Sequence, residues 1–155
     1  SDYGKFEEYV NLRDVTQDSL GLVDHVYASN DIDVKLEFTN VPDVKINPSE
    51  LQQVIINLII NAVQAMDGKG ILTIQSHVLE RDGKNGVCLA FHDSGPGISE
   101  DTINTIFDPF FTTKRAKGTG LGLSISQTII QTAGGIITAD NHPKGGALMS
   151  IWLPT

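Results

Sequence analysis

The most informative part of the sequence runs from Asp93 to Leu123, with Asp93-Ser-Gly95-Pro-Gly97, then Ile106-Phe-Asp-Pro-Phe-Phe-Thr-Thr-Lys114, then Gly118-Thr-Gly120-Leu-Gly122-Leu123. Two asparagines upstream, Asn57 and Asn61, add a fourth element. A nucleotide site needs a carboxylate with spaced glycines, a basic segment, and a second glycine cluster that opens an apolar helix. Each motif alone has low specificity, but four motifs in this order indicate nucleotide binding.

Composition limits the classes of protein to which the chain can belong. Its 155 residues fit one domain with a real hydrophobic core. The formal net charge of −8 argues against nucleic acid and against an anionic membrane as the main partner. A polyanionic ligand therefore needs a local cluster of cations, and Lys114, Arg115 and Lys117 supply one.

The sequence shows no sign of export or of a membrane span. The longest apolar run, residues 54–60, is interrupted by Asn57 and is too short to cross a bilayer. Without an initiator Met or a signal peptide, the chain looks like an excised fragment. Cys88 is the only cysteine, so no internal disulfide can form, which suits a reducing compartment.

Periodicity and turn residues predict one α/β domain at residues 10–155, preceded at 1–9 by the remnant of a helical region or linker. Asn47 and Glu50 form a capping box around Pro48, which predicts the start of a helix. The predicted helices are 14–28, 48–66 and one from near Gly120 to Gly134, and the predicted strands are 10–12, 33–38, 71–78, 87–92, 136–140 and 147–153. This mixed order favours a two-layer α/β sandwich over a parallel doubly wound sheet.

The helix at 48–66 presents the first candidate ligands. Asn57 and Asn61 lie one turn apart and project from one face, with Gln53 and Gln64 on or near it. A neutral amide oxygen can hold Mg²⁺ without cancelling the charge that bridges phosphates. The alternative is a solvated polar stripe, but the apolar character of the rest of the helix favours a ligand role.

Asp93 follows a predicted strand and can accept a hydrogen bond from the exocyclic amine of adenine. Guanine presents a carbonyl oxygen there, so the carboxylate can select the base. Gly95 and Gly97 permit tight turning and close approach of the backbone to a flat ring. An ordinary β-turn is the alternative explanation.

The second glycine cluster predicts a phosphate site. Backbone N–H groups at a helix N-terminus bind phosphate oxygens, and Lys114 precedes them within reach of the terminal phosphate. Phe107, Phe110 and Phe111 are predicted to anchor the intervening loop over the ligand. Simple core packing is the alternative, especially for Phe107.

Taken together, these residues resemble the catalytic and ATP-binding domain of bacterial sensor histidine kinases. That superfamily includes gyrase B, MutL and a heat-shock chaperone, and its fold is often called Bergerat. The matching segments are Gln53-Val-Ile-Ile-Asn57-Leu-Ile-Ile-Asn61-Ala for the N box, Asp93-Ser-Gly-Pro-Gly97 for the G1 box, Phe107-Asp-Pro-Phe-Phe-Thr-Thr-Lys114 for the F box, and 118–123 for the G2 box.

The resemblance implies a mixed sheet packed on about three helices, with ATP under a lid at residues 99–117. Asn61 would hold Mg²⁺, Asp93 would take the adenine amine, and Gly97 would lie against the ring. Asn57 and Lys114 would be the catalytic pair. The remaining nucleotide contacts would come from Gly95, Ile98, Phe110, Thr113, Gly118, Thr119, Gly120, Leu121, Gly122 and Leu123.

Three departures from the family pattern matter. ATP-hydrolysing relatives carry a water-activating Glu one turn before the metal Asn, but Asn57 stands here and cannot act as a base. Gln64 stands where many members have a cation, so neutralisation of the phosphates depends more on Lys114. Residues 146–149 lack the usual Thr residues, and the lid is short.

The resemblance implies a protein-histidine kinase whose phosphoacceptor lies elsewhere. None of the four histidines, His25, His77, His92 and His142, has the acidic residue and Pro that follow the acceptor in the family. The expected partners are therefore ATP, a helical dimerisation and phosphoacceptor domain of the same protein, and a response regulator. The expected location is cytoplasmic, free or as part of a membrane-anchored sensor. A non-catalytic nucleotide-binding module and a serine kinase or ATPase of the same superfamily remain as alternatives.

Overall fold

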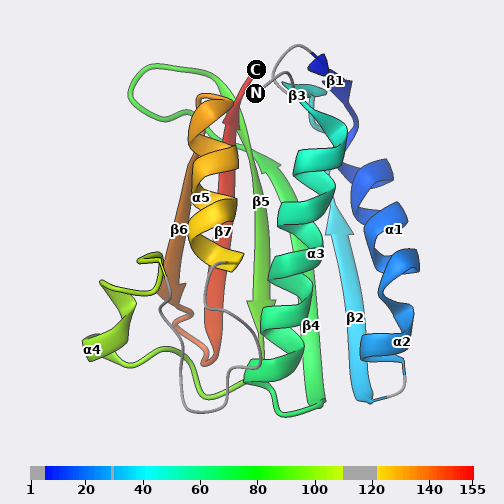
Figure 1. Cartoon of the computed structure of the whole chain (residues 1–155), viewed down its shortest axis with the longest axis vertical. Helices are drawn as coiled ribbons and strands as arrows, with labels where there is room; N and C mark the ends of the chain where they lie inside the picture. The colour runs from blue at the N-terminus through cyan, green and yellow to red at the C-terminus, as the bar shows by residue number, and fades with distance from the viewer. Residues whose placement is uncertain (1–5, 29, 110–121) are drawn as a thin grey trace.

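A five-stranded sheet in the order β2-β4-β5-β7-β6 forms one layer. The helices other than α4 cover one of its faces, whereas α4 lies beyond the edge strand β6 (Figure 1). The computed structural model describes residues 6–28, 30–109 and 122–155. Its elements are β1 Glu8–Val10, α1 Leu12–Leu22, α2 Asp24–Tyr27, β2 Asp31–Phe38, β3 Val44–Ile46, α3 Pro48–Ala65, β4 Lys69–Val78, β5 Gly86–Asp93, α4 Glu100–Ile103, α5 Gly122–Thr132, β6 Ile136–Asn141 and β7 Ala147–Pro154. Only β2 and β4 pair in parallel; the other neighbours in the sheet are antiparallel. The predicted two-layer α/β sandwich is confirmed.

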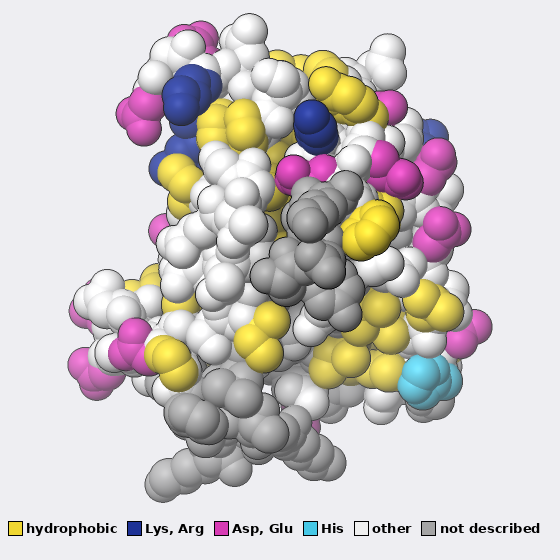
Figure 2. All heavy atoms as spheres, turned by 45° about the horizontal axis from the view of Figure 1, so that its top comes forward, with side chains coloured by type: hydrophobic (Ala, Val, Ile, Leu, Met, Phe, Trp, Pro, Cys, Tyr) yellow, Lys and Arg dark blue, Asp and Glu magenta, His cyan; other side chains and the backbone are white. Residues whose placement is uncertain are grey.

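The excess of Asp and Glu over Lys and Arg in the sequence is visible on the surface. On the face shown in Figure 2, acidic side chains spread along both flanks, whereas Lys and Arg gather only in small groups in the upper half of the view. Among the described residues, no helix is both long enough and apolar enough to cross a membrane.

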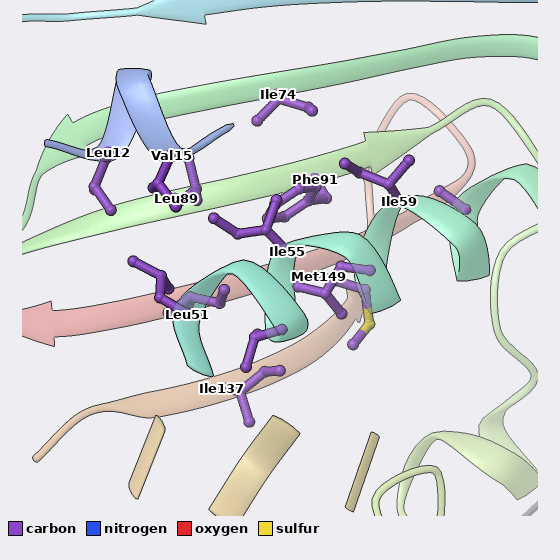
Figure 3. Close-up of a cluster of buried hydrophobic side chains, with 14 of the residues drawn as sticks. Leu12, Val15, Leu51, Ile55, Ile59, Ile74, Leu89, Phe91, Ile137 and Met149 are labelled. Carbon is purple, nitrogen blue, oxygen red and sulfur yellow. The ribbon is translucent and has the colours of Figure 1, made fainter. Parts of the chain in front are cut away.

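The core lies between α3 and the sheet. Seven apolar residues of α3 are buried: Leu51, Val54, Ile55, Leu58, Ile59, Ala62 and Val63. Figure 3 shows Ile55 and Ile59 beside Phe91 of β5, with Ile74 of β4 and Met149 of β7 nearby. Because β5 is flanked by β4 and β7 and lies under α3, almost every residue of it is buried. This packing fixes where the end of β5, and therefore Asp93, lies.

The N-terminal region differs from the prediction. The strand predicted at 10–12 is wrong except at Val10, because the strand is Glu8–Val10, Asn11 is a helix cap and Leu12 begins α1. Val10 pairs with Val44, a partner that local sequence does not reveal. Asn11 caps α1 by accepting the Asp14 N–H at 3.0 Å.

The single helix predicted at 14–28 is divided into α1 and α2. Val23 leaves the helical region with φ −117°, and its N–H is shared between the carbonyls of Ser19 and Leu20, at 3.3 Å from each. The short helix α4 was not predicted. The start predicted near Gly120 falls partly outside the described residues, within which α5 begins at Gly122.

Asn47 caps α3 as predicted, since its side chain accepts the Glu50 N–H at 3.0 Å and Pro48 occupies the first turn. Asn47→Ala should lower the free energy of unfolding by about 1 kcal/mol, because the Glu50 N–H loses its acceptor at a buried helix start. Urea denaturation followed by circular dichroism measures this change. Asn40→Ala, at an exposed loop position, is the matched control and should be nearly neutral. Equal effects of the two substitutions would contradict a capping role.

Candidate functional site

The candidate site residues converge at one end of the sheet. Figure 1 shows that β5 and β6 end there, that β7 begins there, and that α3 ends beside them. The loop after β5 lies against the last turn of α3, since a Cβ atom on Gly95 would be 3.0 Å from the carbonyl oxygen of Ala65. The packing therefore brings the motif at 93–98 to the helix that carries Asn57 and Asn61.

Asp93 is held by two backbone donors. Its side chain is only 5% exposed, and its Oδ1 accepts the N–H of Gly95 at 2.9 Å and that of Ala147 at 3.3 Å. Within the described part of the chain, Oδ2 accepts no hydrogen bond. The carboxylate is thus fixed in orientation, and one of its oxygens is left for a donor on a ligand.

Gly97 and Ile98 form the next part of the loop. Gly97 has φ +86°, a conformation that residues with a Cβ rarely adopt, and a Cβ atom there would lie 2.7 Å from Asn141 Oδ1. The Ile98 N–H donates to Asn141 Oδ1, and Asn141 Nδ2 donates to the Ile98 carbonyl, both at 2.7 Å. The backbone at Ile98, directly after Gly97, is therefore held in place by Asn141.

Asn57 faces the first turn of α5. Its Nδ2 donates to Ser126 Oγ at 3.2 Å, and Ser126 is only 2% exposed. A Cβ atom on Gly122 would lie 2.5 Å from Asn57 Oδ1, so a larger residue there would displace this amide from its present position. The contact joins the predicted N-box helix to the predicted G2 segment.

Asn61 lies one turn further along α3 and is half-buried. Within the described residues its side chain makes no hydrogen bond, so the amide oxygen is available to a ligand. Mg²⁺ in nucleotide sites takes few protein ligands and keeps waters and phosphate oxygens. A single amide oxygen fits that donor set. Among the described residues no group of three or more His, Cys, Asp or Glu could hold a metal.

A hollow of about 380 Å³ opens between α3 and α5. Asn57 and Ser126 line it together with Gly122, Gln53 and apolar side chains of both helices. Gln53, predicted near the asparagine face, therefore contributes to this surface, whereas Gln64 is exposed and is not part of its lining.

The remaining candidates divide into two groups. Leu123 and Phe107 are half-buried and pack against the hydrophobic core, which agrees with the packing alternative for Phe107. The others lie outside the described residues: Phe110, Thr113, Lys114, Gly118, Thr119, Gly120 and Leu121.

Sequence reasoning missed Asn141, Ala147 and Ser126. Their partners in the candidate motifs are 43, 54 and 69 residues away. No local pattern marks them, because each lies in an ordinary strand or helix and reaches the site only through the packing of β6, β7 and α5.

Two histidines stack beside the site without forming a metal centre. The rings of His92 and His142 are 3.9 Å apart, His92 Nε2 contacts the Gly145 carbonyl at 2.7 Å, and His142 Nδ1 accepts the Lys144 N–H at 3.0 Å. Desolvation, His92 and Lys144 all lower the pKa of His142, which favours the neutral ring that this acceptor role needs. These contacts agree with the predicted structural role of both residues.

A second hollow, of about 280 Å³, lies on the sheet and is lined by Cys88, His77, Trp152 and other side chains of β4 to β7. Burial raises the pKa of the Cys88 thiol, although Ser150 and Arg81 act in the opposite direction. Cys88 is therefore a protonated thiol at neutral pH rather than a reactive thiolate.

The chain is similar to known proteins along most of its length. The family model described as histidine kinase-, DNA gyrase B-, and HSP90-like ATPase matches residues 46–155. The sensor histidine kinase ZraS of Salmonella typhi is 39% identical over 148 residues, which are 94% of this chain and 30% of that protein. Sporulation kinase A of Bacillus subtilis is 35% identical over 150 residues, which are 96% of this chain and 24% of that protein. The chain thus spans about a third or less of the curated relatives that it matches.

Solved structures show the same fold. The catalytic domain of the histidine kinase ThkA matches with a TM-score of 0.84 and 33% identity, over 96% of this chain and 95% of that one. ThkA in complex with the response regulator protein TrrA matches with a TM-score of 0.78 and 31% identity, over 96% of this chain and 41% of that one.

Proposed function

The chain belongs to the histidine kinase-, DNA gyrase B- and HSP90-like ATPase family, and from this we propose that it transfers the γ-phosphate of ATP to a histidine of a separate helical dimerisation domain. It is an ATP-binding catalytic domain of the sensor histidine kinase type. The acceptor domain, the residue roles and the metal are parts of the proposal. We also propose that residues 10–155 form the ATP-binding unit. Glu8 and Tyr9, which precede this boundary, pair with β3 of the same unit.

The observation that carries the proposal is the environment of Asp93. A buried carboxylate whose Oδ1 is occupied by two backbone N–H groups presents Oδ2 in one direction. The exocyclic amine of adenine is a donor that suits this oxygen, and the carbonyl of guanine is not. Gly97, four residues further along the same loop, has no side chain and would suit the flat face of the base.

The phosphates would extend from the base toward α3. There Asn61 would hold Mg²⁺, which, when bound, supplies positive charge that screens the β- and γ-phosphates from an incoming nucleophile. Asn57, oriented by Ser126, would hydrogen-bond near the phosphates. Lys114 and the backbone N–H groups of 118–121 remain predicted phosphate contacts, and they lie outside the described residues.

The reaction would be a direct transfer. A neutral imidazole nitrogen of the acceptor histidine attacks the γ-phosphorus, the bond from that phosphorus to the β,γ-bridging oxygen breaks, and ADP leaves. No base need come from α3, because the attacking nitrogen carries no proton. The proton on the other ring nitrogen would leave to solvent or to the acidic residue that follows the acceptor histidine in the family. Water would need a base, and Asn57 cannot act as one, so the site favours transfer over hydrolysis.

The partners follow from this chemistry. We propose that the phosphorylated histidine passes its phosphoryl group to a response regulator, as the complex of ThkA with its response regulator suggests. The acidic surface in Figure 2 offers little to nucleic acid or to an anionic membrane. ATP supply and the free thiol of Cys88 suit a cytoplasmic location, including that of the cytoplasmic part of a membrane-anchored sensor.

The test of this function uses the chain alone and then with an acceptor. Calorimetry should show binding of Mg-ATP, whereas steady hydrolysis should be slow and γ-³²P should not label the chain. A separately produced helical domain with the acceptor histidine should become labelled when it is added. Rapid hydrolysis by the chain alone would indicate an ATPase, and ATP binding without transfer to any acceptor would indicate a non-catalytic regulatory module.

A further inference from the structure

The Asn141 side chain hydrogen-bonds the backbone of the loop at 93–98 in the way that a neighbouring β-strand would. Its side-chain oxygen accepts the Ile98 N–H and its side-chain nitrogen donates to the Ile98 carbonyl, each at 2.7 Å. Both backbone groups of one residue are thus satisfied by one amide that lies 43 positions away. A primary amide is the side-chain group that can donate and accept in this paired way.

The residue paired with Asn141 in the sheet holds the other end of the loop at 93–98. Asn141 and Ala147 are register partners in the β6–β7 pair, and the Ala147 N–H donates to Asp93 Oδ1. This pair of residues therefore holds the loop at both ends, Ala147 at Asp93 and Asn141 at Ile98. The turn between the two strands adds a third contact, since His92 Nε2 lies 2.7 Å from the Gly145 carbonyl.

The loop needs this support because of its composition. It contains Gly95 and Gly97, which have the largest backbone freedom of any residue type. Gly97 adopts φ +86°, and its missing side chain also leaves room for the Asn141 amide, 2.7 Å from where a Cβ atom would stand. An unsupported loop of this kind would have to be ordered by the ligand, at the expense of affinity.

We propose that Asn141 is a positioning residue that holds the loop at 93–98 ready for the adenine base, without itself touching the nucleotide. The inference rests on the proposed function, since it assumes that Asp93 and Gly97 receive the base. It extends that function to a residue outside the four motifs and assigns base recognition to the β6–β7 hairpin as well as to the loop.

The test compares Asn141→Ala and Asn141→Asp with the wild type. Calorimetry well below the melting temperature should show ATP binding about 10-fold weaker in Asn141→Ala, as expected from the loss of two hydrogen bonds. Asn141→Asp should not restore affinity, because a carboxylate cannot donate to the Ile98 carbonyl. The preference for ATP over GTP, measured by competition, should fall in both variants.

Asn85→Ala is the matched control, since Asn85 is an exposed asparagine in the loop before β5, at the opposite end of that strand from Asp93 (Figure 1). It should leave the affinity and the base preference unchanged. If Asn141→Ala does not fold, Asn141→Ser, which keeps a short polar side chain, carries the same measurements.

The outcomes separate the two proposals. A wild-type chain that does not bind ATP would overturn the proposed function. A wild-type chain that binds ATP, together with Asn141 variants that melt at lower temperature but bind ATP with unchanged affinity and base preference, would show a purely structural role and overturn this inference alone. Equal weakening of ATP and GTP would also overturn it, because the adenine end would not be specifically affected.

Discussion

Asn61→Ala should reduce phosphotransfer to an added acceptor domain by about 100-fold or more, the range seen when a preorganised electrostatic contact to a transition state is removed. The side chain is half-buried on α3, and within the described residues its amide makes no hydrogen bond that would stabilise the fold. Its loss should therefore affect the metal and the phosphates rather than stability. Initial rates of ³²P transfer at saturating Mg-ATP measure the effect.

Gln64→Ala is the control for Asn61, because Gln64 is an exposed amide three residues further along the same helix. It should transfer phosphate at nearly the wild-type rate and unfold at the same temperature. Normal transfer by Asn61→Ala would remove this residue from the metal site, and an equal loss in both variants would point to damage to α3 rather than to a lost ligand.

Asp93→Ala should weaken ATP binding by about 1–3 kcal/mol, the usual range for losing a charged hydrogen bond. The substitution also leaves the N–H groups of Gly95 and Ala147 without their acceptor, so the loop should loosen as well. Titration calorimetry with Mg-ATP measures the change. Asp93→Asn is the weaker test, since a rotated amide can still present an oxygen to adenine.

Asp31→Ala removes the same charge from an exposed position on the edge strand β2 and serves as the control for Asp93. It should leave ATP affinity unchanged, which separates a local effect from a change in net charge. An ATP affinity of Asp93→Ala equal to that of the wild type would exclude this carboxylate from the site. Equal affinities of the wild type for ATP and GTP would exclude base selection.

Much of the fold could be predicted because its signals are local. Asn47 and Pro48 mark the start of α3 through capping and φ preference, and the turn after Met66 contains Asp67 and Gly68, both with positive φ. The strands β4 to β7 were found within one or two residues of their ends by alternation and turn residues. The family match of residues 46–155 then confirmed the class that the motifs had indicated.

Elements that depend on distant partners were predicted less well. Val10 is a strand residue only because Val44 pairs with it, and the helix that follows starts two residues later than that pairing ends. The break at Val23 has no local signal, since the apolar pattern that predicts one helix at 14–28 continues through it.

Local sequence was enough to identify the chemical groups of the candidate site. They are a carboxylate and two amides at motif positions, the glycines around them, and an asparagine where ATP-hydrolysing relatives carry a glutamate. The orientation of these groups depends on hydrogen bonds that exist only in the folded protein. Asp93 presents one oxygen because the other accepts from Gly95 and from the distant Ala147, Asn57 is oriented by Ser126, and Ile98 is held by Asn141. Hydrogen bonds of this kind join residues 43 to 69 positions apart, and their partners come together only when α3, α5 and the sheet bury their apolar faces against one another.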